Sequence, residues 1–342
     1  MFHVDVVEPL LTRALPRLRY AAGRLGSGSD VLGLDDVMSR DHDWGCRLTL
    51  LVDEADREMV PQISRLLEQR LPERYGGFPV RFPVTWDASV SHKVEVATVA
   101  DFAVSRLGVD PTGGLSVLDW LSLTGQSVLE VTAGPVFTDQ TVALAQVRAL
   151  LHWYPPDVER YVLAAGWQRL SQQMPFVGRS AECGDELGSR LLSAGLVEDT
   201  MWLAFALARR WPPYAKWRGT VFRELSVAGD LIGLLEAATT APGWRERESA
   251  LADAAEVLLG SQRARGLPAP ASAVTGFWDR PYRSVDQAVQ RALLVEVTDP
   301  DVKRLPPMIG SIEQWADGVD VLSSPGRRAA LQTAYRAWID LA

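Results

Sequence analysis

Cysteine and lysine are both scarce in this chain. Of its 342 residues only Cys46 and Cys183 are cysteine, and they lack the paired spacing of a zinc site. Neither a cysteine-held metal nor a disulfide framework is therefore expected, and the scarcity indicates a cytoplasmic protein. Lys93, Lys216 and Lys303 are the only lysines among 35 basic residues, a bias typical of a GC-rich genome.

Long apolar runs and an excess of positive charge are absent as well. No run of about 18 apolar residues occurs, and charged residues and prolines interrupt residues 1–19, so neither a membrane span nor a signal peptide is expected. The net charge of -8 argues against a general binder of nucleic acid. We expect no membrane and no extended nucleic acid among the partners.

The remaining composition is that of a folded protein of two domains. Hydrophobic residues make up 47% and charged residues 23%, which is enough apolar material for a full core. In the first part, strands are expected at 20–25, 46–52, 80–86 and 90–96, and helices at 4–15 and 61–71. The fold class expected there is a mixed-sheet α/β domain over residues 1–135.

The second part has helical periodicity throughout. Prolines separate the expected helices, which cover 141–153, 157–173, 186–210, 217–238, 245–262, 284–295 and 324–342. The whole chain is therefore expected to be α+β, with an all-helical bundle over 136–342 behind the mixed sheet. The glycine-rich segment 104–140 is interpreted as the hinge.

Three groups of residues in the first part have the properties of a phosphate and metal site. Gly26-Ser27-Gly28-Ser29 is a turn of small residues, which suits close approach to phosphates. Asp41 and Asp43 are spaced to share one face of a strand, where carboxylates hold Mg²⁺. Glu95 on a later strand can be the third carboxylate, or an ordinary exposed strand glutamate.

This pattern resembles that of the DNA polymerase beta-like nucleotidyltransferase superfamily. The thirteen residues between Ser27 and Asp41, or the eleven between Ser29 and Asp41, fit the spacer of that superfamily. The resemblance implies that Gly26, Ser27, Gly28 and Ser29 hold a triphosphate and that Asp41, Asp43 and Glu95 bind metal. His42 and Trp44 depart from the simple apolar residues usual at those positions.

A second resemblance covers more of the chain. The segments 26–36, 39–45, 134–137, 184–185 and 212–217 are similar to those of a bacterial family known as domain of unknown function 4037, which is placed among nucleotidyltransferases. Tyr214-Ala215-Lys216-Trp217, after a long helix, is also similar to the helical domain of aminoglycoside nucleotidyltransferases. That likeness implies an active site between the α/β part and the helices.

Two residues of the helical part are candidates for that site. Lys216 can act as a point charge on nucleotide phosphates, or it can be a surface charge at a helix start. Asp185 can be the general base for an acceptor hydroxyl, or the N-cap of the helix that follows it. The functional interpretation predicts that both face one cleft with Asp41 and Asp43.

The expected function is metal-dependent nucleotidyl transfer. A nucleoside monophosphate would move from ATP or another nucleoside triphosphate to a hydroxyl of a small molecule, with two Mg²⁺ ions as cofactors. Two alternatives stay open: a nucleotidyltransferase that modifies proteins, such as a toxin or stress regulator, and a degenerate protein that binds nucleotide without turnover.

Overall fold

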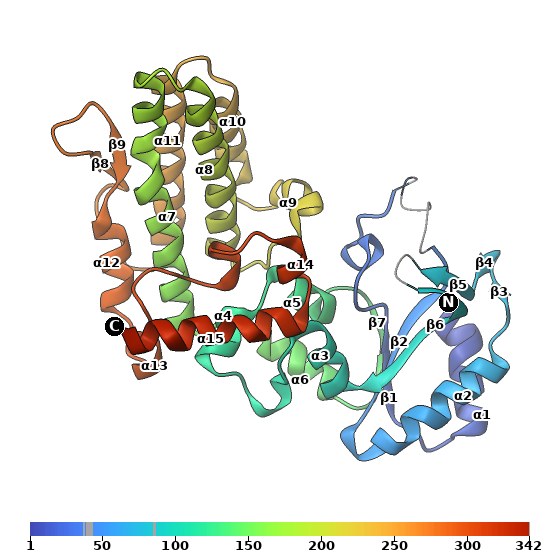
Figure 1. Ribbon diagram of the computed structural model, residues 1–342. Helices are drawn as coiled ribbons and strands as arrows, with labels where there is room; N and C mark the ends of the chain where they lie inside the picture. Colours follow the sequence, from blue (N-terminus) through green and yellow to red (C-terminus); the bar gives the residue numbers. More distant parts are fainter. Residues whose placement is uncertain (37, 39–43, 85–86, 342) are drawn as a thin grey trace. The chain divides into compact units, whose positions relative to one another are not determined.

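The computed structural model describes residues 1–36, 38, 44–84 and 87–341. The chain forms two compact units (Figure 1). The sheet unit comprises Met1–Leu115 and Ser127–His152, and the helical unit comprises Ser116–Gln126 and Trp153–Ala342. The α+β fold class is confirmed. The predicted boundary after residue 135 falls inside the sheet unit, and the division into 1–135 and 136–342 stays a prediction.

A five-stranded mixed sheet forms the centre of the sheet unit. Its strands are β1 (Tyr20–Gly23), β2 (Arg47–Val52), β5 (Arg81–Val84), β6 (Asp87–Thr98) and β7 (Val136–Asp139). They lie in the order β5-β6-β2-β1-β7, and β2 runs parallel to β6 while the other neighbours are antiparallel. Two short strands, β3 (Arg74–Tyr75) and β4 (Phe78–Pro79), pair separately. The strands expected from alternation are therefore present.

One face of this sheet packs against the first helices. A π-helical turn, η1 (His3–Val7), continues into α1 (Glu8–Ala14), and α2 (Val60–Arg70) follows the 3₁₀ segment η4 (Glu54–Met59). Leu48 and Leu50 of β2 are buried in one cluster with Leu11 of α1 and with Ile63 and Leu67 of α2. Because side chains alternate along a strand, the odd-numbered residues of β2 face away from this core.

The segment 104–140, expected to be the hinge, contains several short helices, and the chain passes from one unit to the other within it, after Leu115 and after Gln126. The end of α3 (Val99–Leu107) is followed by the 3₁₀ turn η5 (Pro111–Gly113), α4 (Val117–Ser122) and α5 (Gly125–Thr132), and α6 (Ala143–Leu150) comes after β7. Ser116 and Asp119 form a capping box at the start of α4. Three glycines of this stretch lie between its helices and strands: Gly108 follows α3, Gly114 follows η5 and Gly134 precedes β7.

The helical unit is built around two long neighbouring helices. They are α7 (Pro156–Glu182) and α8 (Glu186–Leu207), beside which α10 (Ala228–Thr240) and α11 (Trp244–Ala264) complete a bundle (Figure 1). The other elements are α9 (Ala215–Phe222), β8 (Val274–Gly276), β9 (Arg283–Val285), α12 (Gln287–Val295), α13 (Pro300–Lys303), η6 (Ile312–Gln314), α14 (Val319–Leu322) and α15 (Pro325–Leu341).

Two expectations about these helices are wrong in detail. The helix expected over 217–238 is two helices, α9 and α10, and the one expected over 284–295 begins as strand β9. Strands β8 and β9 pair as an antiparallel ribbon, an addition to the expected all-helical bundle.

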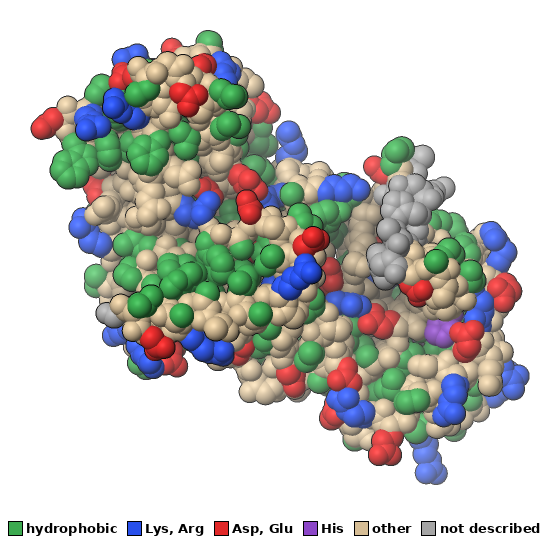
Figure 2. Space-filling view, viewed as in Figure 1, with side chains coloured by type: hydrophobic (Ala, Val, Ile, Leu, Met, Phe, Trp, Pro, Cys, Tyr) green, Lys and Arg blue, Asp and Glu red, His purple; other side chains and the backbone are tan. Residues whose placement is uncertain are grey.

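The visible surface carries charges of both signs, intermixed over the helices and the sheet unit (Figure 2). None of the helices within the described ranges combines the length and the apolar character needed to cross a bilayer.

Candidate functional site

The open face of the sheet carries polar side chains at its centre. In the parallel pair of β2 and β6, Arg47 lies beside Lys93 and Thr49 lies beside Glu95. Leu48 and Leu50 face the α1 and α2 core, so Arg47 and Thr49 point to the opposite side. Two cations and a carboxylate are thereby gathered on one face by strand register alone.

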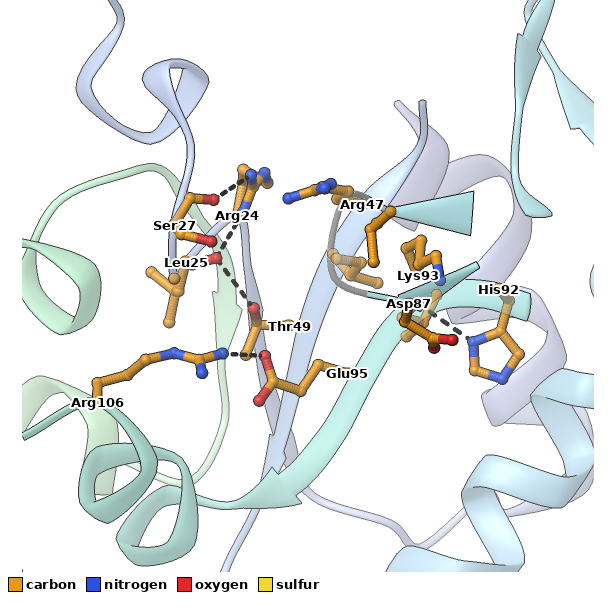
Figure 3. Close-up of a pocket in the computed structure, with 14 residues that line it drawn as sticks. Arg24, Leu25, Ser27, Arg47, Thr49, Asp87, His92, Lys93, Glu95 and Arg106 are labelled. Atoms are coloured by element: carbon orange, nitrogen blue, oxygen red, sulfur yellow. Dashed lines mark hydrogen bonds and ion pairs between the residues drawn. The ribbon is translucent and has the colours of Figure 1, made fainter. Parts of the chain in front are cut away.

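A cavity of about 310 Å³ lies over this face (Figure 3). It is walled by the turn after β1, the first half of β2, the end of β5, β6 and α3. The residues that line it are Arg24, Leu25, Gly26, Ser27, Arg47, Leu48, Thr49, Val84, Asp87, His92, Lys93, Val94, Glu95 and Arg106. The predicted turn residues Gly26 and Ser27 and the predicted carboxylate Glu95 therefore share one cavity.

The turn after β1 is organised by Arg24. Its guanidinium donates to the carbonyl oxygens of Leu25 (2.5 Å) and Ser27 (2.8 Å) and to both carboxylate oxygens of Asp30 (2.5 and 2.8 Å). The backbone N–H of Gly26 donates to the carbonyl of Glu130 (2.8 Å). These bonds hold the small residues of the turn at the cavity wall.

Gly28 and Ser29 have a different part in the turn. Gly28 adopts φ +135°, and a Cβ there would lie 2.3 Å from Asp30 Oδ1, so the position needs glycine. The Ser29 hydroxyl donates to Asp35 Oδ1 (2.6 Å). Of the four residues predicted to hold phosphate, Gly26 and Ser27 line the cavity, whereas Gly28 and Ser29 shape the turn beside it.

Glu95 is ion-paired in this structure. Its Oε2 accepts from Arg106 Nη2 at 2.6 Å, and its side chain keeps 40% of its surface exposed. Arg106 of α3 also lies 3.8 Å from Glu130 and packs over the ring of Phe102. Arg106 therefore neutralises the third carboxylate and positions it at the cavity wall.

The opposite wall is basic, and its two cations lie near the ring of Phe82. Arg47 Cζ lies 5.9 Å and Lys93 Nζ 5.7 Å from the ring centroid of Phe82. His92 lies beside them, and burial lowers the pKa of its imidazole, against the raising effect of Glu68. The cavity thus presents guanidinium and ammonium groups next to a turn of small residues, an arrangement suited to a polyanion.

Asp41 and Asp43, the first two predicted metal ligands, lie outside the described residues, as does His42. Only three residues separate Asp43 from Arg47, where β2 begins. Among the described residues no group of three acidic, histidine or cysteine side chains could hold a metal ion. The two-metal site therefore stays a prediction.

The two candidates of the helical part lie far apart within their own unit. The Asp185 carboxylate accepts from the backbone N–H of Gly188 (2.7 Å) and so caps α8. Lys216 is exposed on α9, with Nζ 4.9 Å from the Trp217 ring centroid. Arg218, two residues later, pairs with Glu198.

Glu198 is about 18 Å along α8 from the helix start that Asp185 caps. The prediction assigns them different atoms, the acceptor hydroxyl to Asp185 and the nucleotide phosphates to Lys216, so this spacing does not decide it. Their roles as general base and phosphate contact stay predictions.

Several lining residues were not identified from sequence. Arg24, Arg47 and Arg106 are three of many arginines and carry no local signal. Lys93 did carry a local signal, because lysine is rare in this chain and because Lys93 precedes Glu95 by two positions on the same expected strand. The register that places it beside Arg47 is visible only in the folded chain.

Comparison with known proteins gives one family. The family model described as domain of unknown function DUF4037 matches residues 120–218, which confirms that resemblance over this stretch. Among solved structures, a nucleotidyltransferase-like protein from Exiguobacterium sibiricum is 11% identical with a TM-score of 0.34, covering 77% of this chain and 78% of that one. No curated protein matches the sequence.

Proposed function

We propose that the chain is a metal-dependent, cytoplasmic nucleotidyltransferase that moves a nucleoside monophosphate from ATP, or another nucleoside triphosphate, to a hydroxyl of a small molecule. The observation that carries the proposal is the cavity of the sheet unit, where Gly26 and Ser27 meet Arg47, Lys93 and Glu95. A triphosphate needs small residues for close approach and cations for its charge, and this cavity offers both.

Within the proposal each group has a distinct task. Gly26 and Ser27 would let phosphate oxygens approach the backbone, while Arg47 and Lys93 would neutralise part of their charge. Asp41, Asp43 and Glu95 would hold the metal ions. Two bound Mg²⁺ ions would polarise the α-phosphate and neutralise the leaving pyrophosphate.

Glu95 fits the metal assignment on the described residues alone. A carboxylate oxygen is the donor that Mg²⁺ prefers, and Glu95 lines the cavity with its Oε2 paired to Arg106. One carboxylate does not make a two-metal site, and the proposal therefore depends on Asp41 and Asp43.

One observation favours a second candidate, a protein that binds nucleotide without turnover. The Arg106 guanidinium compensates the charge of Glu95, which lowers the drive of that carboxylate to ligate a cation. If Arg106 keeps Glu95 when ATP and Mg²⁺ are present, the cavity would hold a triphosphate and transfer nothing.

The three lysines permit a direct test of where the phosphates bind. An acyl-phosphate derivative of ATP transfers its acyl group to a lysine amine beside the phosphates and releases ATP, and peptide mass spectrometry locates the label. We expect acylation of Lys93, suppressed by excess ATP, and none at Lys303 of α13. Label on Lys216 would bring α9 to the phosphates as well, whereas no ATP-protected label on Lys93 would refute the site.

Matched variants separate binding from turnover. Lys93→Gln should weaken ATP binding about tenfold in calorimetry, the loss of one charge-assisted contact, and Lys303→Gln should leave it unchanged. Incubation with α-labelled ATP, Mg²⁺ and a metabolite extract should then yield a labelled product. ATP binding with no labelled product from any extract would favour the second candidate.

A further inference from the structure

A second cavity, of about 420 Å³, lies wholly within the helical unit. One face of α7 contributes Gly166, Arg169 and Gln173 at spacings of three and four residues. One face of α8 contributes Gly195, Glu198, Asp199 and Trp202 in the same manner. Two neighbouring helices ordinarily meet through apolar stripes, so polar faces turned to a shared space need another explanation.

One glycine of α8 borders this space. A Cβ added at Gly195 would meet no atom within 4 Å, although the residue lies in the middle of α8. The remaining wall comes from the start of α5, from α9 and from the stretch leading into α14, which crosses α7 and α8 in Figure 1.

Aromatic side chains form part of the wall. Trp202, Trp315 and Tyr214 all line the cavity. The Trp315 indole N–H donates to the Tyr335 hydroxyl (2.8 Å), and its ring packs edge-on against Trp338. A cavity of this size that combines aromatic walls with polar side chains can hold a small molecule.

The lining is acidic on balance. It contains the four carboxylates of Glu198, Asp199, Glu313 and Asp317 and the two guanidinium groups of Arg169 and Arg218. Each of these guanidinium groups forms an ion pair with a carboxylate of the lining. Arg169 pairs with Asp199 at 2.8 Å, and Arg218 pairs with Glu198. The carboxyl groups of Glu313 and Asp317 make no ion pair of this kind with the two lining arginines.

Glu313 is the more enclosed of these two carboxylates. Its Oε2 accepts from the backbone N–H of Gly125 (2.9 Å). Burial raises the pKa of Glu313 to about 7, against the lowering effects of that N–H and of Arg218 and Arg328. A cation in the cavity would stabilise the ionised form that burial disfavours.

The cavity also coincides with the stretch that the family model matches. Twelve of its twenty lining residues lie within 120–218, so most of the wall belongs to the part of the chain that resembles the family. Glu313, Trp315 and Asp317 come from outside that stretch.

We propose that this cavity binds a small organic ammonium ion, with Glu313 and Asp317 facing the ammonium group and Trp202, Trp315 and Tyr214 covering the apolar part. Aromatic faces attract cations, and a carboxylate gives a charge-assisted hydrogen bond to each N–H. The proposal does not depend on nucleotide transfer in the sheet unit.

The test uses the full chain and three probes of one shape. Saturation-transfer NMR would compare 2-phenylethylamine with neutral 2-phenylethanol and anionic 3-phenylpropanoate, and 1,4-diaminobutane would extend the set to a linear ammonium. The amine should bind with a Kd of about 10 mM or tighter, as ordinary ligand efficiency gives for its few atoms. The alcohol and the acid should bind about tenfold more weakly, a difference of one ion pair.

Two substitutions locate the binding. Gly195→Trp fills the cavity and should abolish amine binding, while Gly260→Trp, at an equally open and exposed glycine of α11, should not. Glu313→Gln keeps an acceptor for Gly125 and should weaken amine binding about fivefold with little effect on the alcohol. The proposal is overturned if neither amine binds, if charge makes no difference, or if Gly195→Trp binds as well as Gly260→Trp.

Discussion

Replacing Glu313 by glutamine should change how the stability of the protein depends on pH. Part of the residue's surface is exposed, but its carboxylate is enclosed beside the helical cavity and accepts the Gly125 N–H. Burial therefore penalises the charged form. Glutamine has nearly the same shape, still offers an oxygen to Gly125, and does not titrate.

The magnitude follows from the two pKa values. The unfolded chain ionises Glu313 near its ordinary pKa of 4.5, and the folded chain ionises it near 7. Over that interval the folded chain holds a proton that the unfolded chain has lost, so the free energy of unfolding falls as pH rises from 4.5 to 7. The full loss is about 3 kcal/mol, at about 1.4 kcal/mol for each pH unit between the two values.

The assay compares urea unfolding of the wild type and of Glu313→Gln, followed by tryptophan fluorescence at several pH values. The unfolding free energy of the variant minus that of the wild type should rise by about 2 to 3 kcal/mol between pH 4.5 and pH 8. Above pH 8 this difference should stay constant. Glu236→Gln on the exposed side of α10 is the control for the chemical change. A difference that stays constant to about 0.5 kcal/mol would refute the burial of this carboxylate.

The other predictions concern the sheet unit. Asp41→Ala or Asp43→Ala should abolish nucleotidyl transfer, because a lost metal ligand removes several kcal/mol of charge stabilisation, while circular dichroism stays that of the wild type; near-normal turnover in either would misplace the metal site. Mg²⁺ should raise ATP affinity, since it would bridge carboxylates and phosphates that repel each other, and equal affinity with and without EDTA in calorimetry would count against that mechanism. Gly28→Ala should lower stability by about 1–3 kcal/mol in thermal unfolding, because its Cβ meets Asp30 at 2.3 Å at φ +135°; Gly33→Ala, also at positive φ but with no atom within 4 Å, should cost less. Equal losses in the two variants would mean that Asp30 moves aside freely.

The ends of some helices could not be predicted from the local sequence. The pattern of α7 was expected to end at residue 173, yet the helix continues through Pro175 to Glu182. A Cβ at Gly178 would lie 2.7 Å from the Trp244 ring and 2.8 Å from the Tyr282 ring, so the last turns of α7 pack closely on other elements. That packing offsets the backbone hydrogen bond that a proline removes.

The break between α9 and α10 is a similar case. The residues between Phe222 and Ala228 contain neither proline nor glycine, so no local signal interrupts the helical pattern expected over 217–238. Phe222, Leu225 and Ala228 are all buried. The surrounding helices bury these three side chains at a bend and not on one straight face. Tertiary packing therefore overrides the local helix propensity here.

By itself, the sequence determined the fold class, the order of the main strands and helices, and the small-residue turn and strand glutamate that share a cavity. Those properties follow from periodicity and from turn chemistry, which act over a few neighbouring residues. Only the tertiary structure decided that Lys93 lies beside Arg47, that Arg106 holds Glu95, and that polar faces of α7 and α8 enclose a second cavity. Strand register and helix rotation are set by burial of the opposite faces against distant elements, so no short stretch of sequence contains them.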